Sequence, residues 1–458
     1  MMFSTATSFP GSHGSASPAW DRKDTIFLIP ILVAAVVLRL FNLDYMEFKA
    51  DEAGNLLLAS ELVSGKAFPL VGIPSSLGTY NPALFIYLLA LPLYFSPNPV
   101  VAAAFVALLN CAAVGALYAF SRRYFSRMTA VVAASFFAVN PWAVFYSRKI
   151  WQQDLLPLFV VAFFYCLFAV ICENRRRYLI GCFMCLAALT QLHLSSLHYV
   201  ILFALVLVWY RPKIGWGYYA VGVSAAFLLY LPYIAFEILN QGYNLRIYFQ
   251  ASHLPWQFRP EALFAPFALA STWGFMRFVD LPLLDLLQFV LTGVGVIYAF
   301  GRWAQSNYQL LILWLFVPLF FFSLSQIDLP LHYFIALYPL LFLLLGVSAA
   351  ALINGSKNSH RAIQYGIVTL LVVLVSYQLL SCVSFLASIK EQRNLAWMEY
   401  GPPFRYRVAE IRDLVNRGIV EPKQVQEKLL EGRSPELSYK YDFLATLYIV
   451  RGIEELPQ

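Results

Sequence analysis

The chain alternates between long apolar runs and short polar turns that carry most of its charges. A bilayer core of about 30 Å needs about 20 residues of α-helix, so runs of roughly this length predict spanning helices. The pattern predicts about eleven spans. They cover residues 25–43, 100–120, 128–140, 155–172, 178–191, 195–210, 218–236, 283–300, 308–324, 332–353 and 363–386.

Charge predicts how these spans are oriented. Arg22 and Lys23 precede the first run, and Arg122 and Arg123 follow the second. Because cytoplasmic loops are enriched in lysine and arginine, these residues place the start of the chain and the turn after the second run in the cytoplasm. Residues 44–98 then lie outside, and an odd number of spans leaves the end of the chain outside as well.

The first external stretch, residues 44–98, contains two segments that can form helices, at 51–64 and 81–95. Glycines and prolines between them break regular structure. A span at 81–95 would put the arginines that follow the next run outside, against the positive-inside rule. We therefore predict two juxtamembrane helices, the second lying in the membrane interface.

The predicted fold is an all-α polytopic membrane protein. Residues 1–24 are rich in Ser, Gly, Ala and Pro, which predicts a disordered cytoplasmic tail. Residues 25–386 form the membrane domain, with a second large external loop at 237–282. Residues 387–458 are charged and predict a small external C-terminal domain, with helical patterning at 406–417.

Composition agrees with this class. Of 458 residues, 60% are hydrophobic and 12% are charged, against about 25% charged residues in soluble domains. The net charge of +7 is the bias expected of cytoplasmic loops beside membrane lipids, so nucleic-acid binding is not predicted. The six cysteines lie in or beside apolar runs, which predicts packing roles.

Two adjacent carboxylates, Asp51 and Glu52, open the first predicted juxtamembrane helix. One interpretation is structural, since acidic residues in the first turn face the positive end of the helix dipole. The other is catalytic, because a carboxylate at the water interface can act as a general base toward an acceptor hydroxyl. Local features leave both interpretations open.

Two cations, Arg148 and Lys149, lie in a predicted external loop, where the positive-inside rule disfavours them. They predict a negative partner, which is either a phosphate or a carboxylate such as Asp154. Arginine suits phosphate because its planar guanidinium can donate two parallel hydrogen bonds. The alternative is an ion pair with Asp154, or a side chain that reaches to the interface.

Further polar groups fall on the same predicted side. His193 could donate to a phosphate or pack between helices, and His332 and Tyr333 open an inward span. Arg246 and Arg259 lie among aromatic residues of the second loop, which suits sugars and phosphates but also describes an interfacial belt. The histidines lack the spacing of a zinc site. Because charge alone gave the orientation, this common side argues for one external site.

Three motifs then occur in an order that resembles a known family. They are an acidic pair before the juxtamembrane helices, a proline, Ser-Arg and aspartate before the fourth span, and a His-Tyr with a later proline. The residues are Asp51, Glu52, Pro141, Ser147, Arg148, Asp154, His332, Tyr333 and Pro339. Over roughly residues 25–350 the chain resembles C-superfamily membrane glycosyltransferases, in the branch of protein O-mannosyltransferases and lipid A aminoarabinose transferases (glycosyltransferase family 39-like).

The resemblance implies transfer of a hexose or pentose from a polyprenyl-phosphate donor, such as undecaprenyl phosphate, to a hydroxyl of a glycan, lipid or protein. The active site would face the periplasm from the cytoplasmic (inner) membrane. Asp51 would take the proton of the acceptor hydroxyl, and Glu52 and Asp154 would orient the acceptor or a cation. No cofactor is required, because protein cations can stabilise the leaving phosphate, although a divalent cation is compatible with the reaction.

Cationic and polar side chains would hold the donor phosphate, namely Arg148, Lys149, His193, His332 and Tyr333. Four residues would contact the sugar or the phosphate: Tyr80, Asn81, Arg246 and Arg259. The sequence departs from the family at two of these positions. Tyr80-Asn81-Pro82 stands where the aminoarabinose transferases have a Lys-Pro-Pro-like segment, and His332 stands where arginine is common.

Two other functions fit parts of the pattern. A lipid-linked glycan polymerase or ligase would use external arginines and a histidine, without Asp51. A transporter or flippase of lipid-linked sugars would place polar residues at mid-membrane depth. The predicted spans are nearly uncharged and the polar groups gather at one face, which favours an enzyme.

Overall fold

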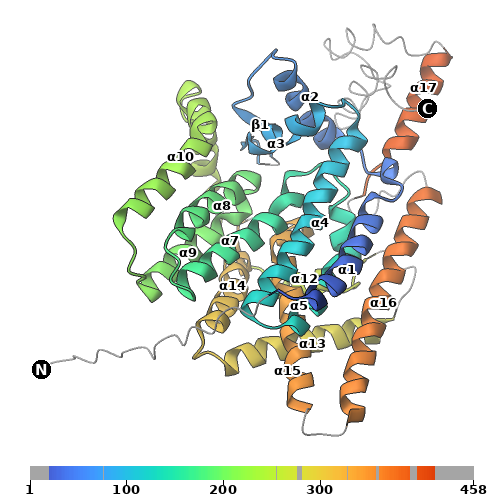
Figure 1. Ribbon diagram of the computed structural model, residues 1–458. Helices are drawn as coiled ribbons and strands as arrows, with labels where there is room; N and C mark the ends of the chain where they lie inside the picture. Colours follow the sequence, from blue (N-terminus) through green and yellow to red (C-terminus); the bar gives the residue numbers. More distant parts are fainter. Residues whose placement is uncertain are drawn as a thin grey trace, which may run out of the picture.

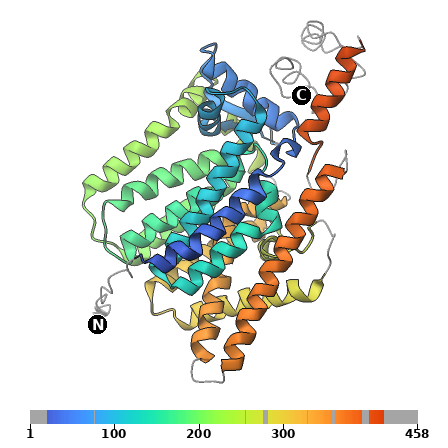
Figure 2. The ribbon, with the colours of Figure 1, turned by 45° about the vertical axis from the view of Figure 1, so that its right-hand side comes forward.

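A computed structural model describes residues 20–75, 77–253, 255–275, 281–326, 329–356, 361–391 and 400–417. Most of these residues are in helices that pack side by side in one bundle (Figure 1). Two short helices and a small sheet lie at one end, and α15 and α16 reach the opposite end (Figures 1 and 2). We call the former the outer end, after the predicted orientation.

Every predicted apolar run contains a helix. These are α1 (Arg22–Leu40), α4 (Pro99–Tyr124), α5 (Arg127–Val139), α7 (Leu156–Ile171), α8 (Tyr178–Leu192), α9 (Leu197–Tyr210), α10 (Trp216–Leu239), α13 (Pro282–Gly301), α14 (Ser306–Ser323), α15 (Tyr338–Gly355) and α16 (Arg361–Glu391). Among the described residues, seven helices are long and apolar enough to cross a membrane, those at α4, α7, α10, α13, α14, α15 and α16. The chain is thus an all-α, multi-pass membrane protein, and the count of eleven spans stays a prediction.

The stretch predicted to be external, residues 44–98, contains a helix at both predicted positions, α2 (Ala50–Val63) and α3 (Leu84–Leu93), and their place beside the membrane stays a prediction. Between them, β1 (Val71–Pro74) pairs antiparallel with β2 (Tyr80–Pro82). The turn uses Gly78, whose φ of +82° is strained for residues with a Cβ. The sequence predicted only irregular structure here, because glycines and prolines are typical of turns and the two strands are too short to show an alternating pattern.

The second external loop is also more ordered than the sequence indicated. It contains α11 (Tyr243–Ala251), β3 (Gln257–Phe258) and α12 (Glu261–Ala270), and β3 pairs with β4 (Leu324–Ser325) after α14. The backbone N–H of Tyr80 donates to Asn244 Oδ1 at 2.7 Å, so this loop packs on the hairpin of the first stretch.

The core of the bundle is formed around α15, which packs against α5 and α13. Two glycines allow this close approach. A Cβ at Gly346 would meet the backbone of Thr129 on α5, and a Cβ at Gly295 on α13 would overlap the backbone of Leu344. Small residues at helix interfaces are a general device of membrane bundles, because they let two backbones come close.

Short elements complete the outer end: η1 (Leu43–Tyr45), α6 (Pro141–Tyr146), η2 (Gln152–Leu155), η3 (Leu194–Ser196), η4 (Leu331–Leu337) and α17 (Phe404–Asn416). Helix α17 lies at the same end as α2 and matches the helical pattern predicted at 406–417 (Figure 2). The disordered tail was predicted at residues 1–24, but Asp21 caps α1 and residues 22–24 form its first turn, so the helix begins earlier than predicted. Residues 1–19 and the rest of the C-terminal domain beyond 417 lie outside the described residues.

Candidate active site

Asp51 is the second residue of α2, directly after the helix start at Lys49 and Ala50. Its side chain is exposed, whereas that of Glu52 is fully buried. Glu52 Oε2 accepts the backbone N–H of Lys49 at 2.9 Å and so caps the first turn. Its other oxygen, Oε1, has no hydrogen-bond partner among the described residues. The two acidic neighbours therefore differ: Asp51 faces outward, and Glu52 fixes the start of the helix.

The surroundings of Asp51 change its protonation. Desolvation by the protein around it raises the pKa of Asp51, and the negative charge of Glu47 adds to the rise, while Lys49, Lys149 and His332 oppose it. Such a carboxyl group can take a proton at moderate pH more readily than a free aspartate.

Glu47 is the centre of the charged cluster, and the sequence interpretation missed it. Its carboxylate is fully buried. Oε1 lies 3.0 Å from Lys49 Nζ and 3.2 Å from Lys149 Nζ, and Oε2 accepts the backbone N–H of Gly401. A buried charge needs such partners. A signal existed, because Glu47 and Lys49 stand within the same short stretch as Asp51.

Lys149 is fully buried beside Glu47, within a cage of aromatic rings. Its Nζ lies 4.2 Å from the ring centroid of Trp151 and 4.7 Å from that of Phe145, with Tyr146 and Tyr400 further out. These faces stabilise the cation. The ammonium is thus enclosed by protein, which does not fit the predicted contact with a donor phosphate. The prediction of a negative partner fits, but the partner is Glu47.

Arg148 does not reach the site either. Its guanidinium is fully buried and donates to backbone carbonyls at the end of α1. Nη1 lies 2.9 Å from the oxygens of Arg39 and Phe41, and Nη2 lies 2.8 Å from that of Asn42. These carbonyls have no helical partners, so Arg148 acts as a C-terminal cap of α1. The structure thus shows a structural role for Arg148, and its predicted contact with the donor phosphate stays a prediction that its burial does not favour.

Asp154 lies on η2 with a fully buried side chain. Neither of its carboxylate oxygens has a hydrogen-bond partner among the described residues. Asn110 Nδ2 donates to the backbone oxygen of Asp154 at 2.9 Å and holds the turn in place. Buried polar atoms are nearly always paired, so these two oxygens are an exception that suits a group brought by a substrate.

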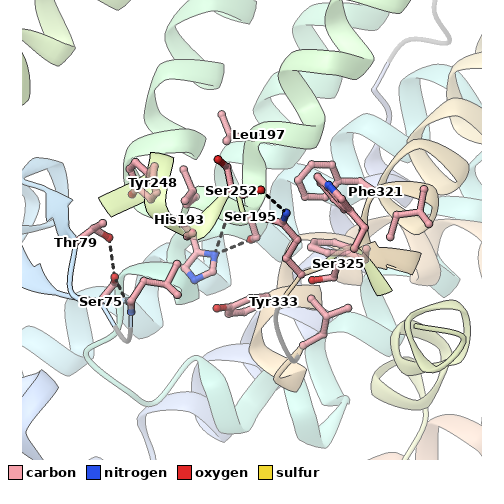
Figure 3. A pocket seen from close by; sticks show the side chains of 18 of the residues that line it. Ser75, Thr79, His193, Ser195, Leu197, Tyr248, Ser252, Phe321, Ser325 and Tyr333 are labelled. Atoms are coloured by element: carbon pink, nitrogen blue, oxygen red, sulfur yellow. Dashed lines mark hydrogen bonds between the residues drawn. The ribbon is translucent and has the colours of Figure 1, made fainter. Parts of the chain in front are cut away.

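A cavity of about 290 Å³ is lined by His193, Ser195 and Tyr333 among others, and none of the charged residues described above is in its lining (Figure 3). Hydroxyl and imidazole groups line one part of it, and apolar residues such as Phe321, Phe322 and Leu329 line another. His193 lies between α8 and η3, and its Nδ1 is 2.6 Å from Ser195 Oγ. Burial lowers the pKa of His193 to about 3, so the ring is neutral in the usual pH range.

His332 connects the cavity with the charged cluster. Its ring centroid lies 6.1 Å from that of His193 and 5.0 Å from that of Tyr333, and both of these residues line the cavity. On the other side, the ring of Trp151, which stacks against Lys149, lies 5.4 Å from His332. His332 also opposes the rise in the pKa of Asp51. The structure therefore brings Asp51, His332, His193 and Tyr333 into one region.

The remaining candidates separate into two groups. Asn81 lines the cavity, and its Nδ2 donates to the oxygen of Ile73 at 2.9 Å. Tyr80 does not line the cavity, and its ring lies against that of Tyr243, with centroids 5.7 Å apart. Arg246 is exposed and donates to the oxygen of Asn240 at 3.4 Å, and Arg259 Nη1 lies 3.9 Å from a carboxylate oxygen of Glu261.

Within the described ranges, no three His, Cys, Asp or Glu side chains are grouped so that they could hold a metal ion. No family model matches the sequence, and no curated protein matches it. The comparison with solved structures is the informative one.

The structure is similar to apo ArnT from Cupriavidus metallidurans, with a TM-score of 0.60 and 14% sequence identity over 93% of this chain and 85% of that one. The chain has the fold of ArnT. The same ArnT bound to undecaprenyl phosphate gives a TM-score of 0.51 at 14% identity, over 94% of this chain and 75% of that one. ArnT is the lipid A aminoarabinose transferase, and the resemblance that the motifs predicted is thereby confirmed for the fold.

A second neighbour is the oligosaccharyltransferase of Archaeoglobus fulgidus in complex with Zn and sulfate. The TM-score is 0.53 at 11% identity, over 88% of this chain and 56% of that one. The membrane bundle is thus common to ArnT and to this larger protein. At identities this low the comparison concerns the fold, and the chemistry of the site depends on the residues described above.

Proposed function

We propose that this protein transfers a sugar from a polyprenyl-phosphate donor to a hydroxyl acceptor at the outer face of the membrane, with Asp51 as the general base. The observation that carries the proposal is the exposed carboxylate of Asp51, whose pKa is raised and which interacts electrostatically with His332. The ring of His332 in turn lies 6.1 Å from that of His193 and 5.0 Å from that of Tyr333, which both line the cavity. The fold shared with ArnT, which has been seen with undecaprenyl phosphate, supports a lipid-linked donor.

In this reaction the acceptor oxygen attacks the anomeric carbon of the donor sugar. The acceptor hydroxyl gives its proton to Asp51 as the new C–O bond forms. The bond from the anomeric carbon to the phosphate oxygen breaks on the opposite face, and the electron pair leaves with the polyprenyl phosphate. Attack from the face opposite the leaving group inverts the anomeric centre. The product is a glycoside, and Asp51 must lose its proton before the next cycle.

The donor phosphate needs positive or hydrogen-bonding groups that remain accessible. Because Arg148 and Lys149 are enclosed by protein, we assign this role to Lys49, whose side chain is 31% exposed and stands two residues before Asp51. His332, His193 and Tyr333 extend from there to the cavity and suit hydrogen bonds to a phosphate or a sugar. Hydroxyl-bearing walls suit a sugar, and the apolar wall suits a prenyl chain.

The test is turnover in proteoliposomes that contain a panel of undecaprenyl-phosphate-linked sugars and candidate acceptors. Asp51→Asn should lower turnover by about 10²–10⁴-fold, which is the usual contribution of a positioned base. Glu61→Gln is the matched control, because Glu61 is an exposed acid on the same helix. Near-normal turnover by Asp51→Asn would exclude Asp51 as the base and favour the polymerase or ligase. The donor consumed would identify the sugar.

A further inference from the structure

Residues 400–404, Tyr400-Gly401-Pro402-Pro403-Phe404, cross the segment that leads into α2. We call them the C-terminal strap. The N–H of Phe48 donates to the oxygen of Pro402 at 3.1 Å, and the N–H of Phe404 donates to the oxygen of Met46 at 2.8 Å. These bonds flank an antiparallel bridge between Glu47 and Pro403.

Side chains hold the strap in place on both sides. Tyr400 is fully buried, and its hydroxyl donates to the oxygen of Tyr45 at 2.6 Å. The rings of Phe48 and Phe404 pack edge to face with centroids 5.0 Å apart. Pro402 and Pro403 restrict φ and so reduce the entropy lost when the strap is ordered. The strap is therefore a built contact and not a loose end of the chain.

Gly401 is the point where the strap meets the charged cluster. Its N–H donates to Glu47 Oε2, while Glu47 Oε1 pairs with Lys49 and Lys149. A Cβ at position 401 would overlap the aliphatic stem of Lys49, from Cγ to Cε. The φ of Gly401 is not positive, so the glycine is required for space and not for its backbone conformation.

We propose that Glu47 and Gly401 are positioning residues, through which the C-terminal strap fixes Lys49 beside Asp51. This inference rests on the proposed function. Glu47 ties the strap, Lys49 and Lys149 together, and Gly401 leaves the space in which the stem of Lys49 lies. Because Lys49 is the N-cap residue of α2, the same contacts orient the first turn that carries Asp51.

The proposal predicts opposite pH effects for two substitutions. Asp51 faces the charges of Lys49, Glu47, Lys149, His332 and its neighbour Glu52. Glu47→Gln removes a charge that raises the pKa of Asp51, so the acid limb of the pH–rate profile should move to lower pH. The charge of Lys49 lowers the pKa of Asp51. Gly401→Ala displaces Lys49 and so raises the pKa of Asp51, and the acid limb should move to higher pH.

The experiment compares Glu47→Gln, Gly401→Ala and Gly366→Ala in full-length protein, measured in proteoliposomes with the donor that the wild type consumes. Gly366 lies on α16, and a Cβ there would meet nothing within 4 Å, so it is a matched glycine control. Thermal unfolding measures whether each variant is folded. We expect both strap variants to lose about ten- to a hundred-fold in kcat, the cost of a small misplacement of reacting groups, with the two opposite pH shifts.

The outcomes separate this inference from the proposed function. If Asp51→Asn is inactive while both strap variants match Gly366→Ala, the positioning role is overturned and the function stands. A loss of kcat in folded strap variants without opposite pH shifts indicates a merely structural contact and also overturns it. Near-normal turnover of Asp51→Asn overturns both proposals. Opposite shifts of the acid limb of the pH–rate profile, together with the loss of kcat, support the positioning role of Glu47 and Gly401.

Discussion

The two ends of the bundle both bury carboxylates, but they satisfy them differently. At the inner end, Asp24 is fully buried, and its Oδ1 accepts from Arg122 Nε at 2.8 Å, Arg127 Nε at 2.9 Å and the hydroxyl of Tyr118 at 3.2 Å. At the outer end, both carboxylate oxygens of Asp154 and one of Glu52 lack hydrogen-bond partners among the described residues.

This difference separates a structural cluster from a chemical one. A carboxylate that is fully supplied with donors has no capacity left for a substrate, and its removal strands its partners. Buried oxygens without donors cost stability in the free protein, and such costs persist at sites that bind or react. The inner cluster therefore holds helices together, whereas the outer cluster keeps buried oxygens without donors, which under the proposed function lie at the reacting site.

Removing Asp24 tests the structural half of this comparison and should have the largest effect on stability. Asp24→Ala leaves Arg122 and Arg127 without their buried partner, which should cost about 3–5 kcal/mol. Thermal unfolding of purified protein measures the loss. Asp21→Asn is the control, because asparagine keeps the N-cap of α1 and removes only the charge that pairs with the same Arg127 from a side chain that is 49% exposed, so the loss should be much smaller. Equal losses in the two variants would contradict the contrast.

Glu52 should make the stability of the folded protein depend on pH. Burial raises the pKa of Glu52 above its ordinary value of 4.5, and the charge of Glu47 adds to the rise. Above that ordinary value the unfolded chain has released this proton while the folded chain retains it. Stability should therefore fall as pH rises toward the raised pKa, by up to about 1.4 kcal/mol for each pH unit.

The measurement is thermal unfolding of the wild type and Glu52→Gln as a function of pH. Glutamine has no proton to lose, so this contribution to the pH dependence should disappear. Glu61→Gln, on the exposed face of α2, should keep the wild-type slope. An unchanged slope in Glu52→Gln would show that other groups set the pH dependence of the outer end.

Asp154→Asn should have the smallest effect on stability. Because the carboxylate has no hydrogen-bond partners among the described residues, replacing it with a neutral isostere strands no partner and should change stability by no more than about 1 kcal/mol. Turnover should fall, because an amide nitrogen replaces one of the two carboxyl oxygens that would orient the acceptor substrate. A destabilisation as large as that of Asp24→Ala would mean that Asp154 is a structural residue, and the comparison of the two ends would fail.

Much of the fold could be predicted from apolar runs and from charge. Each predicted run contains a helix, and the arginines at the end of α4 led to the assignment of α3 to the membrane interface, which stays a prediction. The short β1–β2 hairpin could not be predicted, because a few residues rich in glycine and proline carry no clear period.

The sequence identified candidate residues of the site but not the contacts that they make. Sequence indicates which side of the membrane a charge lies on, but not the partner it finds there. Arg148 donates to carbonyls more than a hundred residues earlier, and Lys149 pairs with Glu47. Asp51, which is exposed, and the half-buried His193 and His332 stay candidates, whereas Lys49, whose side chain is 31% exposed and stands two residues before Asp51, was overlooked.

The contact between Glu47 and Gly401 joins residues that are 354 positions apart. During synthesis the segment that carries Asp51 enters the membrane early, whereas the strap leaves the ribosome only after every helix from α2 to α16 has been made. A chain that stops before residue 400 would hold its base without a fixed lysine beside it. Under the positioning role proposed for the strap, the site is therefore complete only after residue 404 has been made.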